Sequence, residues 1–167
     1  LILKGRDIMK KDVVNAIVEI PFRSRNKYEI NKVTGKIQLD RVLYSAMGYP
    51  AEYGTIEETL ASDGDPLDIL IMATEPTYPG CIVPAYLKMI DDGKEDYKII
   101  SVVDCDPRYD DVNSLEDISK FTLKEIKNFF ENYKKLQHVK VEIGKYYSKE
   151  EALEVLEKCR INYKCQK

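Results

Sequence analysis

Short, β-rich segments separated by glycine and proline fill the first two thirds of the chain, and this spacing limits the possible fold more than any other feature. The segments are Val13–Ile20, Tyr28–Ile30, Ile37–Leu39, Ile69–Met72, Ile82–Leu87 and Lys98–Val103. Residues 32–35, Lys-Val-Thr-Gly, form a plausible hairpin turn between the second and third of them. The other separators contain Gly64 with Pro66, then residues 76–80, then Gly93. The pattern predicts many short strands joined by turns.

The last third of the chain is predicted to be mostly helical. Thr122 and Glu125 have the spacing of a capping box, and Ser148 and Glu151 have the same spacing. Apolar residues follow each box at helical spacing: Leu123, Ile126, Phe130, Tyr133 and Leu136, then Ala152, Val155, Leu156 and Cys159. Between the helices, Val139–Ile143 resembles one more strand. Many short strands followed by two helices predict a mainly β (α+β) fold, a small barrel with helices packed outside.

Length and composition narrow the class of protein. The 167 residues contain no repeat or linker, so we expect one domain spanning residues 1–167. The net charge of −3 argues against a general nucleic-acid binder, which is usually basic. No apolar run reaches the roughly 20 residues that span a bilayer, and Leu1–Lys11 lacks the features of a signal peptide, so we expect no membrane association. Four cysteines without a CxxC pair and a lone His138 favour reduced thiols in a cytoplasm over a zinc site.

Three carboxylates lie close together in the segment most informative about chemistry. Asp63, Asp65 and Asp68 fall within six residues, around a Gly-Pro turn and directly before an apolar strand. Convergent carboxylates repel one another unless cations hold them, and Mg²⁺ and Ca²⁺ take such oxygen ligands. A solvated acidic turn is the alternative. An EF-hand loop fits poorly, because Leu67 occupies a ligand position and Asp68 the position of the required glycine.

A second acidic stretch, Asp91–Asp96, would by itself be interpreted as an exposed hairpin tip. Lys27, Arg41 and Lys98 lie in or next to predicted strands, and each alone would be interpreted as a surface charge. Together the acidic and basic groups have the composition of a phosphate-processing site, which needs carboxylates for metals and cations for phosphate oxygens.

At these residues the sequence resembles the soluble inorganic pyrophosphatases typical of bacteria (family I), from about Ile17 to the end of the last helix. Asp63–Asp68 fits the signature D-x-D-P-x-D followed by apolar residues. Further segments match the family in order: Glu19–Pro21, Lys27–Glu29, Asp40–Arg41, Tyr49–Gly54, Leu87–Asp91, Asp96–Lys98 and Phe129–Lys134.

The resemblance implies a five-stranded OB-like barrel with helices outside, hydrolysis of pyrophosphate by a Mg²⁺-activated water, and usually a cytoplasmic homohexamer. Mn²⁺ or Zn²⁺ are possible substitutes for Mg²⁺. The implied metal residues are Asp63, Asp68, Asp91 and Asp96, with Glu19 and Glu29 in the outer shell. Asp65 is the implied general base, and Tyr53 supports the site by hydrogen bonding. The implied phosphate contacts are Lys27, Arg41, Lys98, Tyr133 and Lys134. The helical pattern gives Tyr133 an alternative role as a core residue.

Two segments are shorter than the family pattern. Pro84–Tyr86 leads into Leu87 about four residues early, and Gln137-His138 leads into Val139 about two residues early. Each is either a real deletion or a gap in the sequence. A four-residue loss keeps the side-chain alternation of a strand. If the second deletion is real, we expect His138 to replace a phosphate-contacting lysine.

Other functions remain open from the sequence. A barrel that binds metal-phosphate groups or single-stranded nucleic acid needs a basic groove with stacking aromatic residues, whereas this chain groups aspartates. An enzyme acting on nucleotides or polyphosphate needs a base- or chain-binding pocket, which the sequence neither reveals nor excludes.

Overall fold

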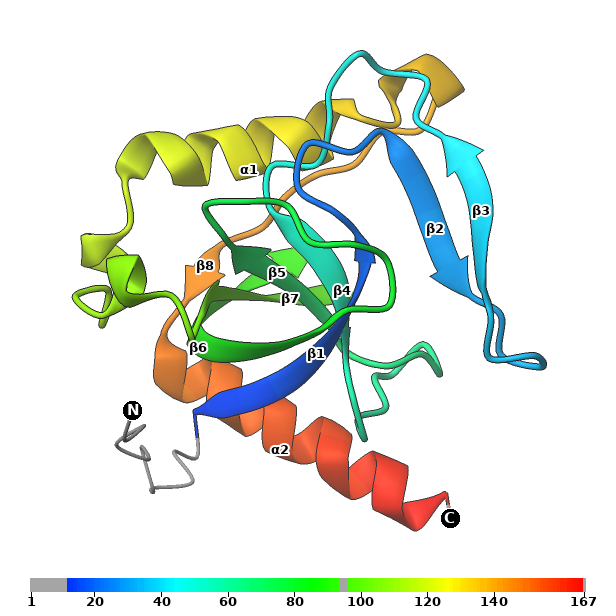
Figure 1. Ribbon diagram of the computed structural model, residues 1–167. Coiled ribbons are helices and arrows are strands. Elements are labelled where there is room, and N and C mark those ends of the chain that lie inside the picture. Colours follow the sequence, from blue (N-terminus) through cyan, green and yellow to red (C-terminus); the bar gives the residue numbers. More distant parts are fainter. Residues whose placement is uncertain (1–11, 94–95, 167) are drawn as a thin grey trace, which may run out of the picture.

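Five strands close into a barrel (Figure 1). The structure is a computed structural model that describes residues 12–93 and 96–166, without the side chains of residues 86–93. The strands are β1 Val13–Ile20, β2 Asn26–Ile30, β3 Ile37–Val42, β4 Glu52–Ile56, β5 Asp68–Met72, β6 Ile82–Gly93, β7 Asp96–Val103 and β8 Tyr146–Tyr147. The helices are α1 Lys120–Asn132 and α2 Lys149–Cys165. Short 3₁₀ turns occur at Pro107–Tyr109, Leu115–Asp117 and Lys135–Gln137.

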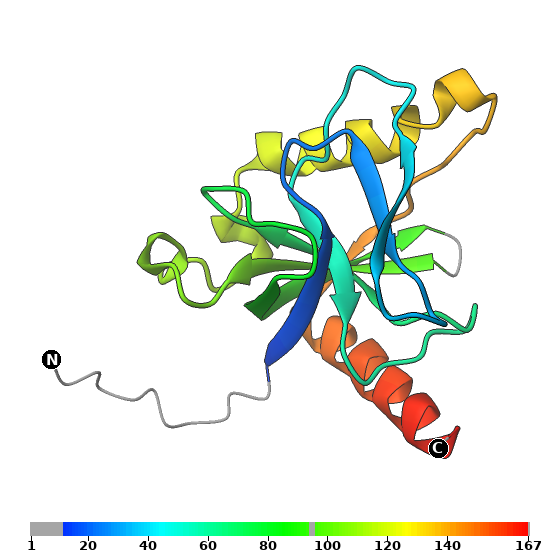
Figure 2. The ribbon, with the colours of Figure 1, turned by 45° about the vertical axis from the view of Figure 1, so that its right-hand side comes forward.

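The barrel has the strand order β1-β4-β5-β7-β6 and closes because β1 also pairs with β6. The β5–β7 pair is parallel, and the other barrel pairs are antiparallel. Strands β2 and β3 form a separate hairpin that projects beside the barrel, as Figure 2 shows. This arrangement confirms the predicted small barrel with helices packed outside it.

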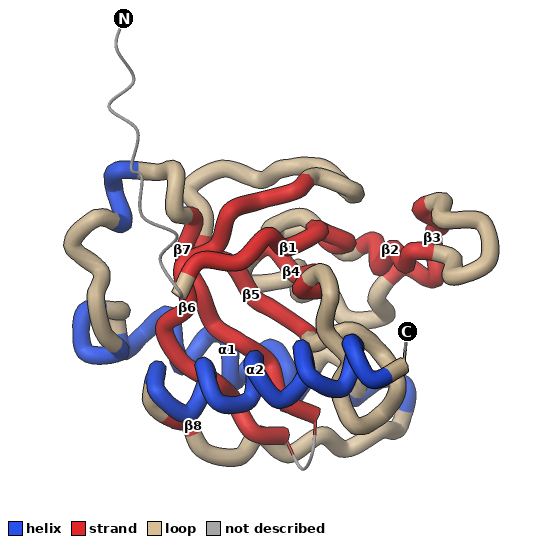
Figure 3. The backbone as a smooth tube through the Cα atoms, turned by 90° about the horizontal axis from the view of Figure 1, so that it is seen from below, coloured by secondary structure: helices blue, strands red, loops and turns tan. Residues whose placement is uncertain are grey.

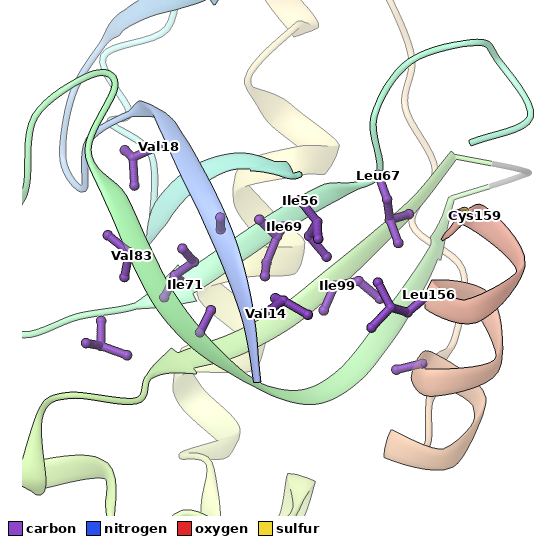
Figure 4. Packing of buried hydrophobic residues seen from close by; sticks show 14 residues of the cluster. Val14, Val18, Ile56, Leu67, Ile69, Ile71, Val83, Ile99, Leu156 and Cys159 are labelled. Carbon is purple, nitrogen blue, oxygen red and sulfur yellow. The ribbon is translucent and has the colours of Figure 1, made fainter. Parts of the chain in front are cut away.

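Two hydrophobic clusters lie on opposite faces of the barrel strands. Val14, Ile69 and Ile99 belong to the first, which Leu156 and Cys159 of α2 also join (Figure 4). The alternate positions of the same strands, including Leu70 and Ile100, face the second cluster beneath α1. Helix α1 lies above the barrel and α2 below it in Figure 1, and Figure 3 shows α2 running across the barrel strands. Each fully buried aliphatic side chain contributes roughly 1.5–3 kcal/mol to folding.

The start of α1 and the strand predicted between the helices were wrong. Helix α1 begins at Lys120, because the Ser119 hydroxyl accepts a hydrogen bond from the backbone N–H of Phe121 at 3.2 Å and caps the helix before Thr122. Val139–Ile143 has strand-like alternation but forms no strand. Instead, β8 pairs with β6 next to Ile90 and Asp91.

The segment Pro84–Leu87, which is short by comparison with the family, lies within an unbroken strand. Pro84, Ala85 and Tyr86 of β6 pair with β1, and β6 pairs with β7 from Ala85 onward with a bulge between Leu87 and Met89. The barrel therefore closes with the shorter sequence. Within the described residues, no helix has the length and apolar character that a membrane crossing requires.

Candidate metal and phosphate site

The loop between β4 and β5 holds the first two aspartates in fixed positions. The Asp63 side chain accepts a hydrogen bond from the backbone N–H of Asp65 at 3.0 Å, and Gly64 adopts φ +89°. A side chain at that φ is strained, so the turn requires glycine. Buried Leu67 anchors the end of the loop, and its N–H donates to the Thr59 hydroxyl at 2.9 Å. We call residues 57–67 the acidic loop.

Asp68 begins β5 and lies beside Lys98 of β7 in the parallel register. The Lys98 ammonium donates to Asp68 Oδ2 at 2.8 Å and to Asp96 Oδ1 at 3.0 Å. The Tyr53 hydroxyl of β4 donates to the same Asp68 oxygen. On β6, Asp91 is also a register partner of Lys98. Strands β4, β5, β6 and β7 therefore meet around Lys98.

Burial and neighbouring charges together set the protonation of Lys98 and Tyr53. It lowers the pKa of Lys98, but the carboxylates of Asp68 and Asp96 outweigh it, so the pKa is raised and the ammonium stays charged. Burial and the nearby Asp68 raise the pKa of Tyr53 well above its usual value of 10.0. Tyr53 is therefore a permanent hydrogen-bond donor to Asp68 at neutral pH.

The β2–β3 hairpin contributes a second group of charges. Lys27 pairs with Arg41 in the hairpin register and forms ion pairs with Glu29 and, at 3.1 Å, with Asp40. Arg41 contacts Asp40 at 2.8 Å. Burial lowers the pKa of Lys27, but the bonds to Glu29 and Asp40 outweigh it and the pKa is raised. The Nε of Arg41 is buried without a hydrogen-bond partner in the described protein, which leaves a donor for an oxyanion.

Glu19 of β1 has the most perturbed carboxyl group of the set. Burial raises its pKa from the usual 4.5 to about 7, and the charges of Asp68 and Glu29 add to the effect of burial. A hydrogen bond with the backbone of Ile30 and the charge of Lys27 oppose the rise. Burial is therefore the main reason that Glu19 resists ionisation, and the neighbouring carboxylates add a smaller contribution.

Tyr133 and Lys134 lie at the end of α1. The ring of Tyr133 stacks on Phe129 with centroids 5.0 Å apart and is largely buried. The Lys134 ammonium lies 5.3 Å from the Tyr133 ring centroid. Packing is thus an observed role of Tyr133, as its helical spacing allowed.

The predicted metal residues are only partly assembled in the described structure. Asp68 and Asp96 converge on Lys98, Asp63 and Asp65 share the acidic loop, and the side chain of Asp91 lies outside the described residues. Among the described side chains, no three Asp, Glu, His or Cys residues form a group that could hold a metal. The donor chemistry nevertheless fits a hard divalent cation, because the donors are carboxylate oxygens.

Two charged residues of this region were not among the sequence candidates. Asp40 lies between Lys27 and Arg41 and contacts both. Burial raises the pKa of Asp40, but the positive charges of Lys27 and Arg41 outweigh burial, so the pKa is lowered overall. Asp40 directly precedes Arg41 in a segment that matches the family, and this position could have marked it as a site residue. Lys32, in the hairpin turn, forms an ion pair with Asp65. Local sequence gave no signal for it, because 33 residues separate the two.

His138 adopts a left-handed conformation with φ 59° at the end of the Lys135–Gln137 turn. It lines a cavity of ≈ 500 Å³ together with Lys135 and Lys140. The cavity also contains Glu131 and Glu142, so its charge is mixed.

Comparison with known proteins identifies the family. The family model for inorganic pyrophosphatase matches residues 16–164. This chain belongs to the inorganic pyrophosphatase family. An inorganic pyrophosphatase of Geobacillus stearothermophilus is 51% identical over 159 residues, which cover 93% of this chain and 96% of the relative.

Solved structures agree with this family. The inorganic pyrophosphatase of Thermus thermophilus superposes with a TM-score of 0.89 at 38% identity, covering 96% of both chains. That of Helicobacter pylori gives 0.87 at 37% identity, covering 96% of this chain and 99% of the other. The family implies a divalent metal cofactor.

Proposed function

We propose that this chain hydrolyses inorganic pyrophosphate to two phosphates with a metal-activated water and Asp65 as the general base. The observation that carries the proposal is the meeting of Asp68 and Asp96 at Lys98, close to the acidic loop. Carboxylates for metal and cations for phosphate thereby occur in one place, on the fold of an inorganic pyrophosphatase family.

Magnesium is the proposed cofactor, with Mn²⁺ or Zn²⁺ as substitutes. Asp63, Asp68, Asp91 and Asp96 would hold it, and Glu19 and Glu29 would lie in its outer shell. Bound divalent ions lower the pKa of water, so that a nucleophile forms at neutral pH.

Each proposed site residue has its own role in the hydrolysis. Asp65 accepts a proton from the water, the water oxygen forms a bond to phosphorus, and the bridging P–O bond breaks with its electron pair leaving on phosphate. Lys27, Arg41 and Lys98 stabilise charge on the phosphoryl oxygens, and Tyr133 and Lys134 also contact phosphate. The unpartnered Nε of Arg41 supports its assignment. Tyr53 orients Asp68 through its hydrogen bond.

The test is phosphate release from pyrophosphate, compared with ATP and tripolyphosphate at equal concentration with Mg²⁺. We expect pyrophosphate to have the highest kcat/KM. A preference for ATP or tripolyphosphate would favour the nucleotide or polyphosphate alternative. Binding of pyrophosphate without phosphate release would favour a non-catalytic binding module.

We also propose that the chain acts as one domain over residues 1–167, in the cytoplasm, and as a homohexamer. The oligomer rests on the resemblance to bacterial pyrophosphatases. Light scattering at the assay concentration tests it: a mass near six times the 19.3 kDa of one chain is expected, and a species of 19.3 kDa alone contradicts it.

A further inference from the structure

The turn between β2 and β3 is ordered by its own hydrogen bonds and carries Lys32. The side chain of Asn31 accepts from the N–H groups of Val33 at 3.0 Å and Thr34 at 2.9 Å. The N–H of Asn31 donates to the carbonyl of Lys36 at 2.9 Å, and Gly35 supplies the left-handed φ of +66° that closes the turn. Lys32 therefore extends from a backbone of defined shape.

The Lys32 ammonium forms an ion pair with Asp65 Oδ1. Figures 1 and 2 show the hairpin turn beside the acidic loop between β4 and β5. The two side chains are 74% and 55% exposed, and exposed ion pairs contribute little to folding stability. The pair therefore contributes little to the stability of the fold, and its effect is expected on Asp65 itself.

Lys32 completes a pattern of lysine partners around the site. Lys98 binds Asp68 and Asp96, and Lys27 binds Glu29 and Asp40. Both of those lysines belong to the proposed phosphate contacts. Lys32 differs, because its partner is the proposed base.

We propose that Lys32 is a positioning residue for Asp65. It holds one carboxylate oxygen and leaves the second to accept the proton of the attacking water. A carboxylate on an exposed loop otherwise rotates about its side-chain bonds, and each unproductive rotamer lowers the fraction of enzyme ready to react. This inference rests on the proposed function, since it requires Asp65 to act as the base.

The experiment measures kcat and KM for pyrophosphate at saturating Mg²⁺ in the full chain. Lys32→Met should lower kcat by roughly tenfold with little change in KM, because small misplacements of a reacting group are costly. Lys32→Arg, which keeps the ion pair, should retain most of the turnover. Lys36→Met removes the same charge from the same turn without a contact to Asp65, and it should behave as wild type.

A double-mutant cycle with Asp65→Asn decides whether Lys32 acts through Asp65. Adding Lys32→Met to Asp65→Asn should cause no further loss of kcat. Wild-type turnover in Lys32→Met overturns the inference, and so does an equal fold-loss in both backgrounds. A rise in kcat would mean that the pair restrains Asp65 rather than orienting it. These failures occur in a wild-type enzyme that releases phosphate, whereas failure of the proposed function removes wild-type release itself.

Discussion

The Lys98 ammonium lies 2.8 Å from Asp68 Oδ2, and the two residues are register partners on the parallel strands β5 and β7. Strand pairing therefore fixes the contact, and the 11% exposure of the Lys98 side chain shields it from water. The same ammonium also contacts Asp96 at 3.0 Å. Lys98 thus offsets part of the negative charge of two carboxylates, and a net charge of one carboxylate is left over.

Replacing Lys98 should destabilise the metal-free protein. Lys98→Met leaves Asp68 partly buried without its cation, which we expect to lower the free energy of unfolding by about 1–3 kcal/mol in EDTA. Urea denaturation measures the change. Lys127→Met, which breaks an exposed ion pair with Glu131 on α1, is the control and should cost less than about 0.5 kcal/mol. An equal decrease in the free energy of unfolding in both variants would mean that the Lys98–Asp68 contact stabilises the protein no more than an exposed ion pair does.

Glu19 should make the metal-free protein less stable at alkaline pH. Its folded pKa of about 7 lies above the usual 4.5, so the folded state binds this proton more tightly than the unfolded chain does. Stability from this group is therefore full below about pH 4.5 and is lost as the pH rises through 7. Glu19→Gln should raise the free energy of unfolding by about 1–2 kcal/mol at pH 8 in EDTA and change it little at pH 4.5.

The control for this comparison is Glu154→Gln, on the exposed side of α2. Thermal unfolding at pH 4.5 and pH 8 gives the stability of each variant. If Glu19→Gln and Glu154→Gln show the same pH dependence, burial of Glu19 does not perturb its ionisation.

Asp65 and Asp68 should respond differently to the same chemical change. Asp65→Asn should lower turnover by about 10²–10⁴-fold while most metal affinity survives, because general-base catalysis has this magnitude. Asp68→Asn should weaken metal binding as well as turnover, since Asp68 is a proposed metal ligand whose carboxylate also contacts Lys98 and Tyr53. Calorimetric titration with Mg²⁺, beside turnover at saturating Mg²⁺, separates the two effects. Full rescue of Asp65→Asn by excess Mg²⁺ would make Asp65 a ligand and not the base.

Strands and helices with strong local signals were predictable from the sequence. Val13–Ile20 is rich in β-forming residues and forms β1, and the Ser148–Glu151 capping box marks the start of α2 in the structure. Strand β4, Glu52–Ile56, was not predicted, because Gly54 interrupts its run of β-forming residues. The glycine is a tertiary requirement, since an added Cβ would lie 2.0 Å from the Ile17 carbonyl oxygen of β1.

The candidate site likewise has residues that the local sequence predicts and contacts that only the fold creates. Asp63, Asp65 and Asp68 stand out because they are neighbours in the sequence, whereas the meeting of Asp68 with Lys98 depends on strand register. The resemblance supplied Lys98 as a candidate, and only the fold brought Lys32 to Asp65. For Val139–Ile143 the local sequence predicts a strand that the fold does not form, because β8 pairs with β6 instead.

Metal-dependent release of phosphate from pyrophosphate tests the central claim most directly. The wild-type chain is assayed for phosphate after removal of divalent ions with EDTA, and again after excess Mg²⁺ is added. We expect no release above background in EDTA and recovery of full turnover with Mg²⁺, since carboxylates without metal cannot activate water to the same extent. Full turnover in EDTA, or no phosphate release under either condition, would contradict it.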